Sequence, residues 1–564
     1  MKKKISILRD KFKKYGIDGY IVPKNDEYFT EYSKINRLKI ISNFSGSAGL
    51  AVILKKKNYL FTDGRYAIQS QIESGKNFKI KNFEKLLNCS LFKNLNLGID
   101  PKLFTYKQIK RYFLKYNKIK FINENLIDQI QKKKMGKSSY FFSLKKKIVG
   151  ESSSSKLSKI ANYLKKHKSD FIFISAPENV AWILNIRGND GPNSPIPNCR
   201  LIVSKSKKSI LISEIKKCKM ILKDNVLKLN QIVDFKEFPK KIHNLTGKNF
   251  IIDENSCSIH FEDIIKSKFR ILRKKDPTYI LKSIKNKTEI DNMRKVHELD
   301  GVALTKFIFW IKNINKKKIT EVDAQNKLEK FRKMNKNYLY PSFDTIAGSG
   351  KNGAIIHYRA KKDNCKIINN KDIFLCDSGG QYKYGTTDVT RTICFSKPSQ
   401  NIKNIFTYVL KGHISVATTN LKKDNIGKKI DFRARKYLKQ KNLDYAHGTG
   451  HGVGFFLNVH EGPQSISKIN NVKIKEGMIL SNEPGYYKKN EFGIRIENLI
   501  YVEKIKNKIY FKNLTLAPIE KDLINFDLLN LSERNYLFKY HLSVYSKISP
   551  YLNNSEKKWL ASFI

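Results

Sequence analysis

The sequence predicts a multidomain protein in which two copies of one α/β module precede a third domain of different pattern. Three observations support this prediction. The chain has 564 residues, which is too long for a single hydrophobic core. Its first half contains a repeat at a nearly constant offset, and a long run of helical periodicity begins near residue 279.

The repeat is defined by three separated landmarks. The offsets are 152 from Asp18 to Asp170, 150 from Val52 to Ile202 and 153 from Asp100 to Asp253. A constant offset of this kind indicates duplication. Each copy alternates short β-branched runs with amphipathic stretches, which is the pattern of an α/β domain. We expect the copies at residues 1–149 and 150–278, with the serine run 152–155 as a hinge.

The third domain is expected to span residues 279–510. Apolar residues recur at helical spacing over 281–313, with acidic residues near the start of that run. A later amphipathic helix over 402–420 carries His413, which we expect at the surface. The remaining residues, 511–564, form a C-terminal extension in which Ser532 is the expected N-cap of an apolar helix.

The composition favours a cytoplasmic protein. The formal net charge is +60, but lysine spread evenly along the chain is typical of a solvated surface, so no nucleic-acid partner is expected. The seven cysteines include Cys89 and form no CxxC pair, which indicates neither a zinc knuckle nor a disulfide framework. No run approaches the ~18–20 apolar residues of a membrane span, and charges interrupt the N-terminal apolar run before it could act as a signal peptide.

Titratable residues gather in one late stretch of the chain. His447, His451 and His460 lie in HGTGHGVGFFLNVHEGP, and Glu483 and Glu497 follow in SNEPGYYKKNEFGIRIEN. Such side chains are costly among glycines and apolar residues unless something pairs with them, and a metal ion is the simplest partner.

Two further carboxylates lie upstream, in strand-like runs rich in Ile, Leu, Val and Thr: Asp377 and Asp388. Four carboxylates and one imidazole carry too much negative charge for one divalent ion and suit Mn²⁺ or a similar metal. Two ions roughly 3.5–4 Å apart fit this set better. The period of two within GIRIEN puts Arg495 and Glu497 on one face of a strand.

The motifs DSGGQYKYGTTDVTRT, HGTGHGVG, LNVHEGP, NEPGYY and GIRIEN, in this order, resemble the metal-site motifs of the pita-bread metallopeptidases. Within that group the chain is most similar to the long, three-domain form of the aminopeptidase P family, because SFDTIAGSGKNGAIIHY and LTLAPIEKDLI flank the site. The resemblance covers nearly the whole chain. It implies two creatinase-like α/β N-terminal modules followed by an α+β pita-bread catalytic domain.

The resemblance also implies a ligand arrangement. Asp377 would bind the first metal and His451 and Glu483 the second, and Asp388 and Glu497 would bridge both. The spacing of the three histidines in the motif does not by itself decide which one is the ligand. Two divalent ions, Mn²⁺ by first choice, are the implied cofactors.

The implied reaction is hydrolysis of the bond between an N-terminal residue and a following proline by a metal-bridged hydroxide. Glu483 would take and return the proton. His357, His447 and His460 would contact the substrate as hydrogen-bond donors, and Arg495 would hold ligand carboxylates. Short peptides with proline in second position are the implied substrates, and the two N-terminal modules would limit substrate size. A homodimer is the implied assembly, and the extension 511–564 is the interface element that would help to form it.

Two alternatives remain open at this stage. A sister hydrolase of the same fold, such as a prolidase, methionine aminopeptidase or creatinase, shares the site but not the two preceding domains and the LAPIE tail. A binding module that has lost catalysis and contacts histones, RNA or ribosomes would suit the positive charge. Binding modules of this type lack some of the five ligands, whereas this sequence has all five.

Overall fold

The computed structural model describes residues 1–87, 91–131, 139–315 and 318–564. Within these residues the chain divides into two compact units, Met1–Tyr279 and Ile280–Ile564. Cys89 lies outside the described residues, and the six described cysteines are free thiols.

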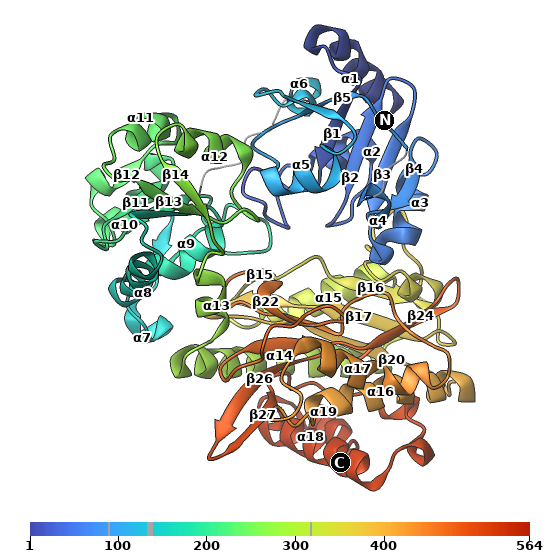
Figure 1. Ribbon diagram of the computed structural model, residues 1–564. Coiled ribbons are helices and arrows are strands. Elements are labelled where there is room, and N and C mark those ends of the chain that lie inside the picture. The colour runs from blue at the N-terminus through green and yellow to red at the C-terminus, as the bar shows by residue number, and fades with distance from the viewer. Residues whose placement is uncertain (88–90, 132–138, 316–317) are drawn as a thin grey trace. The chain divides into compact units, whose positions relative to one another are not determined.

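The first unit contains two six-stranded sheets of the same topology (Figure 1). Their strand orders are β4-β3-β2-β1-β5-β6 and β12-β11-β10-β8-β13-β14. In each sheet the central strand pairs antiparallel with one neighbour and parallel with the other. The strands are β1 Gly19–Pro23, β2 Leu50–Leu54, β3 Asn58–Thr62, β4 Lys79–Asn82, β5 Asn96–Ile99, β6 Lys118–Phe121, β8 Phe171–Ile174, β10 Arg200–Ser204, β11 Ser209–Ile212, β12 Ile232–Val233, β13 Asn249–Ile252 and β14 Arg270–Arg273.

The predicted repeat is visible in equivalent contacts as well as in strand order. Asp18, just before β1, accepts a hydrogen bond from Lys55 at 2.6 Å and from the backbone N–H of Asn96 at 3.0 Å. Asp170, just before β8, accepts one from Lys205 at 2.7 Å and from the N–H of Asn249 at 3.1 Å. In both copies, therefore, the aspartate before the central strand makes an equivalent ion pair with a lysine and an equivalent bond to a backbone N–H. The fold is therefore two duplicated α/β modules followed by a different domain.

The helices of the first unit are mostly short. They are α1 Lys2–Tyr15, α2 Arg37–Ser42, α3 Ala67–Ser74, α4 Glu84–Leu87, α5 Tyr106–Tyr112, α6 Leu126–Ile130, α7 Lys146–Val149, α8 Ser153–Lys166, α9 Pro177–Leu184, α10 Lys219–Lys223, α11 Phe238–His243 and α12 Ile259–Lys266, and a short antiparallel pair joins β7 Phe142–Ser143 to β9 Ile186–Arg187.

The predicted hinge at residues 152–155 is wrong. Ser152 is the N-cap of α8, and its side chain accepts a hydrogen bond from the N–H of Ser155, so the serine run forms a helix start. The division into modules at residues 149 and 150 stays a prediction; the segment 141–144 already hydrogen-bonds to Asn185 and Lys217 in the second module.

The second unit packs long helices around several antiparallel sheets (Figure 1). Its helices are α14 Lys287–Asn313, α15 Glu321–Lys333, α16 Gln400–Ala417, α17 Gly427–Lys439, α18 Leu531–Ile548 and α19 Asn554–Ala561, and α13 Thr278–Ser283 leads into it. Its strands are β15 Tyr338–Pro341, β16 Ile346–Ser349, β17 Phe374–Ser378, β18 Gly380–Tyr382, β19 Gly385–Thr386, β20 Val389–Ile393, β21 Gly450–Gly452, β22 Glu461–Ile466, β23 Ile479–Asn482, β24 Gly485–Lys488, β25 Phe492–Arg495, β26 Asn498–Ile505 and β27 Lys508–Asn513.

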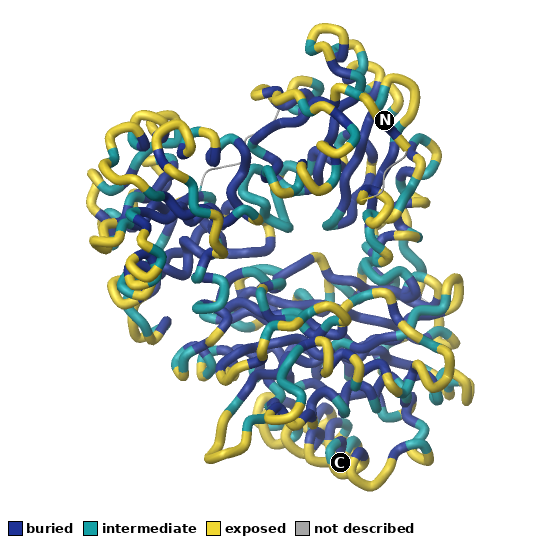
Figure 2. The backbone as a smooth tube through the Cα atoms, viewed as in Figure 1, coloured by how far each residue is buried: buried dark blue, intermediate teal, exposed yellow. Residues whose placement is uncertain are grey.

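Two of these sheets position the candidate site. The first has the order β16-β17-β20, and the second β22-β21-β23-β26-β27. Figure 2 shows that their central strands are buried while the surrounding loops and the outer faces of the helices are exposed. Side chains at the ends of buried strands are held in fixed positions, which suits a site that needs accurate geometry.

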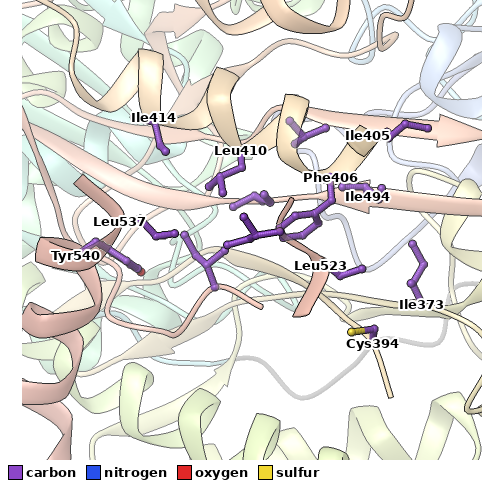
Figure 3. Packing of buried hydrophobic residues seen from close by; sticks show 14 of the residues in the cluster. Ile373, Cys394, Ile405, Phe406, Leu410, Ile414, Ile494, Leu523, Leu537 and Tyr540 are labelled. Atoms are coloured by element: carbon purple, nitrogen blue, oxygen red, sulfur yellow. The ribbon is translucent and has the colours of Figure 1, made fainter. Parts of the chain in front are cut away.

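The apolar core of this unit lies between α16, α18 and the strand β25. Ile405, Phe406 and Leu410 of α16 pack in one cluster with Leu537 of α18 and Ile494 of β25 (Figure 3). The cluster joins the C-terminal extension to the rest of the unit, because residues of both belong to it. The extension is therefore part of the packed core of this unit.

Two sequence predictions in this unit are wrong. His413 is fully buried, with a relative exposure of 0%, because it shares a covered face of α16 with Leu410, and α17 covers the side that carries Gly412. The N-cap of α18 is Asn530, which forms a capping box with Glu533, and Ser532 lies inside the first turn.

Across the part of the chain that the structure describes, we find no helix with the length and apolar character needed to cross a bilayer.

We predict that Gly412→Ala destabilises the second unit. A Cβ at Gly412 of α16 would overlap the carbonyl oxygen of Ala434 in α17, and such overpacking costs about 1–3 kcal/mol. The better helix propensity of alanine returns at most about 1 kcal/mol. Urea unfolding followed by circular dichroism should show a lower midpoint for Gly412→Ala and no loss for Asn401→Ala, an exposed position of the same helix. Equal midpoints would contradict close packing of α16 on α17.

Candidate metal centre

Two neighbouring strands bring Asp377 and Asp388 together. Asp377 lies in β17 opposite Thr390 of β20, and Asp388 immediately precedes β20. Both carboxylates are buried, with relative exposures of 8% and 3%. Antiparallel pairing thus converts a separation of eleven residues in sequence into direct proximity, as the strand pattern predicted.

His451 and Glu483 enter from the other sheet. His451 lies in β21, and Glu483 directly follows β23, where its N–H donates to the carbonyl of Thr449 at 2.8 Å. The His451 Nε2 atom lies 3.4 Å from Asp388 Oδ2 and 3.6 Å from Glu483 Oε1. The other ring nitrogen, Nδ1, lies 2.9 Å from the carbonyl oxygen of Gly452. A proton on Nδ1 would satisfy that carbonyl and leave Nε2 free to bind a metal.

Glu497 lies between β25 and β26. Its Oε2 accepts a hydrogen bond from Thr390 Oγ1 at 2.7 Å, and its N–H donates to the carbonyl of Thr390 at 3.1 Å. The alternation predicted for residues 494–497 is present: Ile494 and Ile496 are buried in the apolar core, while Arg495 and Glu497 both contact the Thr390 hydroxyl.

Potential ligand atoms of these residues form overlapping groups in which all atoms lie within 4.8 Å of one another. Asp388, Glu497 and His451 each belong to two groups, and for the two carboxylates this is the arrangement expected of ligands that bridge two ions. The groups are Asp377, Asp388 and Glu497; His451, Glu483 and Glu497; and Asp388, His451 and His460. His460 therefore also stands close enough to be considered as a ligand.

The pKa values show that the negative charges of these buried carboxylates are not fully balanced by the protein. Burial, followed by the charge of Asp377, raises the pKa of Asp388 to about 6. Burial and the charges of Asp388 and Glu483 raise the pKa of Glu497 well above its ordinary value. Burial lowers the pKa of the His451 imidazole, but its hydrogen bond to Asp388 and the charge of Glu483 outweigh this effect and raise the pKa to about 9.

Among the residues that the structure describes, Asp377 Oδ1 is buried and accepts no hydrogen bond. A buried oxygen without a partner is costly, and a metal ion would satisfy it. The orphaned oxygen, the overlapping groups and the carboxylate-rich donor set together fit a pair of divalent cations.

A second ring of polar residues surrounds the carboxylates. Arg495 donates to Asp377 Oδ2 at 2.6 Å and to Tyr487 Oη at 2.5 Å. Tyr487 Oη also lies 2.9 Å from His447 Nε2. The His447 Nδ1 atom lies 4.0 Å from Glu483 Oε2. A continuous chain of contacts thus runs from Asp377 through Arg495, Tyr487 and His447 to Glu483.

The loop that carries His447 is held by α17. Arg435 donates to the carbonyl of His447 at 2.5 Å and to the carbonyl of Tyr445 at 2.7 Å, and its guanidinium also lies over the Tyr445 ring. Asp431 pairs with Arg435 at 2.8 Å and accepts from Thr449 Oγ1 at 2.7 Å. This buried ion pair fixes the backbone on both sides of His447.

The remaining candidate, His357, lies in the segment after the 3-10 turn Gly350–Ala354 and is half-buried. In the described part of the chain it does not belong to the groups of clustered ligand atoms. His460 stacks edge-on against His451, with ring centroids 4.4 Å apart. The structure thus gathers eight of the nine predicted site residues into one connected cluster.

Sequence reasoning missed several residues that hold the cluster in place. Thr390 bonds Glu497 and Arg495, Ser481 Oγ donates to Glu483 at 3.1 Å and accepts from the N–H of His451, and Tyr487 joins His447 to Arg495. Thr390 could have been found from its place two residues after Asp388 on an alternating strand. Tyr487 stands inside NEPGYY, but nothing local distinguishes it from Tyr486.

Sequence models of known families cover almost the whole chain. Metallopeptidase family M24 matches residues 291–504, and the C-terminal region of peptidase M24 matches residues 508–562. The creatinase/prolidase N-terminal domain matches twice, at residues 4–130 and 131–289. The double match agrees with the duplication seen in the two sheets.

Curated relatives match over full length. A probable Xaa-Pro aminopeptidase P of Laccaria bicolor is 36% identical, over 99% of this chain and 92% of its own length. Xaa-Pro aminopeptidase 1 of Dictyostelium discoideum is 37% identical, over 100% of this chain and 96% of its own.

Solved structures show the same relationship. An X-prolyl aminopeptidase from Caenorhabditis elegans, described as a cytosolic enzyme with a di-nuclear active site, superposes with a TM-score of 0.91 at 28% identity, covering 99% of this chain and 98% of its own. A prolidase from Pyrococcus horikoshii gives a TM-score of 0.54 at 28% identity and covers 65% of this chain and 99% of its own. The chain therefore belongs to the aminopeptidase P family of Xaa-Pro aminopeptidases, within the M24 metallopeptidases.

Proposed function

We propose that the protein is a di-metal aminopeptidase that hydrolyses the bond between an N-terminal residue and a following proline. The observation that carries the proposal is the overlap of ligand groups at Asp388, Glu497 and His451. The two shared carboxylates, which can each bind two metals, support a site for two ions side by side. Membership of the Xaa-Pro aminopeptidase family supports the substrate class.

Five residues would hold the metals in this proposal. Asp377 lies at one side of the cluster, His451 and Glu483 lie at the other, and Asp388 and Glu497 lie between them. One imidazole among four carboxylates is a hard donor set, for which Mn²⁺ is the first choice. Two such cations would lower the pKa of a shared water toward neutrality and polarise the carbonyl of the scissile bond.

Glu483 is placed to move the proton. Its Oε1 accepts a hydrogen bond from Ser481, and its Oε2 faces His447 Nδ1 at 4.0 Å. A carboxylate in this position can take the proton of the attacking water and return it to the proline nitrogen as that group leaves. The contact with Ser481 limits rotation of the carboxylate during this transfer.

The histidines outside the ligand set would bind the reacting peptide bond. His447, His460 and His357 can donate to the carbonyl oxygen as negative charge develops on it, or bind the proline. His447 is oriented by Tyr487, which Arg495 also bonds. Because proline lacks a backbone N–H and fixes its own φ, a site for Xaa-Pro bonds needs donors that do not rely on that N–H.

The proposal extends to the domain boundaries, the assembly and the compartment of the protein. We propose that residues 279–510 form the catalytic domain, that 511–564 form the extension, and that the protein works as a homodimer in the cytoplasm on short peptides. The full-length similarity to a structure described as a cytosolic enzyme supports the compartment.

A peptide panel tests the proposed function. The Mn²⁺-loaded protein, incubated with Xaa-Pro-Yaa tripeptides, Xaa-Pro dipeptides and tripeptides with Ala in place of Pro, should release Xaa from the proline tripeptides alone. Amino-acid analysis of the products provides the measurement. Preference for the dipeptides would indicate a prolidase instead. Failure to cleave any peptide with metal bound would favour a binding module.

The carboxylates shared between groups should be indispensable for metal binding. Asp388→Asn and Glu497→Gln each remove a charge that neutralises both ions, so the metal content should fall from about two ions per chain to one or fewer, and turnover should be lost. Mass spectrometry of the dialysed protein measures the metal. Glu503→Gln on β26 serves as the control, because its carboxylate pairs with Lys512 outside the cluster. Near-normal turnover in either test variant would refute the assignment.

The three histidines of the glycine-rich stretch should behave differently. His451→Ala should lower the metal content, whereas His447→Ala and His460→Ala should keep the metal and reduce turnover by roughly 10²–10³, the range for losing one oxyanion donor. His243→Ala, at an exposed position of the first unit, should change neither quantity. Equal loss of metal in all three site variants would mean that ligand and donor roles are not divided in this way.

A further inference from the structure

Arg391 is a buried arginine that the proposed mechanism does not use. It lies in β20 between Thr390 and Thr392, opposite Cys376 of β17, and its relative exposure is 2%. The two threonines face Glu497 and Arg495. Because side chains alternate along a strand, Arg391 leaves β20 on the other side, which is the side of the buried apolar residues Val389 and Ile393. A guanidinium in such a place must be satisfied by oxygen atoms.

Arg391 finds these oxygens in two different parts of the chain. Three belong to the strands of the metal cluster and three to the C-terminal segment of residues 514–541, called here the tail segment. The acceptors are the carbonyls of Thr390 at 2.8 Å, Glu497 at 2.6 Å, Ala517 at 2.8 Å and Pro518 at 2.9 Å, together with Asn498 Oδ1 at 2.8 Å and Tyr540 Oη at 2.9 Å.

The strand side of this arrangement concerns Glu497 directly. Glu497 falls between β25 and β26, where the ladder of neither strand fixes it. Its backbone is held by the bond from its N–H to the carbonyl of Thr390 and by the bond from Arg391 to its own carbonyl. Arg391 Nη1 donates to the carbonyls of both Thr390 and Glu497 and so ties the two residues together. Thr390 Oγ1 also donates to the carboxylate of Glu497.

The tail side is itself firmly held. Tyr540 Oη donates to the carbonyl of Ala517 at 2.8 Å, and the N–H of Ile519 donates to His541 Nε2 at 3.1 Å. The backbone of Leu516 lies so close to α14 that a Cβ at Gly301 would overlap its carbonyl oxygen. The tail segment therefore presents fixed acceptors to Arg391.

We propose that Arg391 is a positioning residue. It bonds both to the tail segment and to the carbonyl of Glu497, so that docking of the tail segment holds Glu497 in place. Residues far downstream of the last ligand then set the affinity of the metal centre. The proposal rests on the proposed function, because it concerns binding of the same metals. It assigns the tail segment a role inside one chain, in addition to the proposed role in dimer formation. Partners that orient metal ligands typically contribute about 10–100-fold to metal affinity.

Direct metal binding tests this role without relying on catalysis. The full-length protein and its variants are dialysed against a series of MnCl₂ concentrations, and bound Mn²⁺ is measured by mass spectrometry. Arg391→Ala should raise the Kd of the weaker site by about 10–100-fold. Tyr540→Phe, which removes a single hydroxyl from the tail side, should raise it by a smaller factor in the same direction. Arg391→Lys should fall between Arg391→Ala and the wild type, because an ammonium cannot reach all of these oxygens.

Val544→Ala is the matched control. Val544 lies one turn after Tyr540 on α18, is fully buried in the same apolar cluster, and does not contact Arg391 through a hydrogen bond. This variant loosens the packing of α18 but leaves the bonds between the tail segment and Arg391 intact, so it should bind Mn²⁺ like the wild type. Circular dichroism confirms that each variant is folded before it is compared.

The outcomes separate the inference from the proposed function. Weaker Mn²⁺ binding in Tyr540→Phe but not in Val544→Ala supports the role of Arg391. Wild-type affinity in folded Arg391→Ala and Tyr540→Phe, or equal weakening in Val544→Ala, overturns it while the proposed function stands. A wild type that binds no Mn²⁺ overturns both.

Discussion

Mutual repulsion of buried carboxylates is the constraint on which this site depends. Asp377, Asp388 and Glu497 place ligand oxygens within 4.8 Å of one another, where two unit negative charges repel by about 3–4 kcal/mol at an effective dielectric constant near 20. Arg495 neutralises one of them through Asp377. Burial first, and then the charges of the neighbouring carboxylates, raise the pKa of Asp388 and Glu497, and a pair of divalent cations would offset this negative charge.

The fold holds these groups together against that repulsion by using the ends of buried strands. Asp377, His451 and Glu483 are anchored by ladder or backbone bonds in two sheets. Glu497, between two strands, relies instead on side chains, with Thr390 on its carboxylate and Arg391 on its carbonyl. The groups that surround the cluster are bonded to one another, so movement of one would disturb several others.

Local patterns in the sequence predicted the parts of the structure that depend on periodicity and repetition. The offset near 152 predicted two modules that share strand order and the ion pairs of Asp18 and Asp170. The alternation in GIRIEN predicted that Arg495 and Glu497 would share a face. The ligand set itself came from motifs in a fixed order, which carry more information than any one of their residues.

Local sequence patterns did not predict the features that depend on tertiary contacts. His413 was expected at the surface because it is polar, but it lies on the same helix face as Val409 and Leu410, so it is buried. The N-cap of α18, by contrast, is decided locally, because Glu533 lies three residues after Asn530 and completes a capping box with it. In the sequence Arg391 is one more charged residue on a strand, because five of its six acceptors lie more than a hundred residues downstream.

Anomalous X-ray diffraction from crystals of the Mn²⁺-loaded protein, recorded on both sides of the manganese absorption edge, tests the central claim most directly. The account predicts two manganese peaks, both in contact with the carboxylates of Asp388 and Glu497, with Asp377 on one ion and His451 and Glu483 on the other. A single metal peak in active protein, a tightly bound zinc ion in its place, or peaks away from these carboxylates would contradict it.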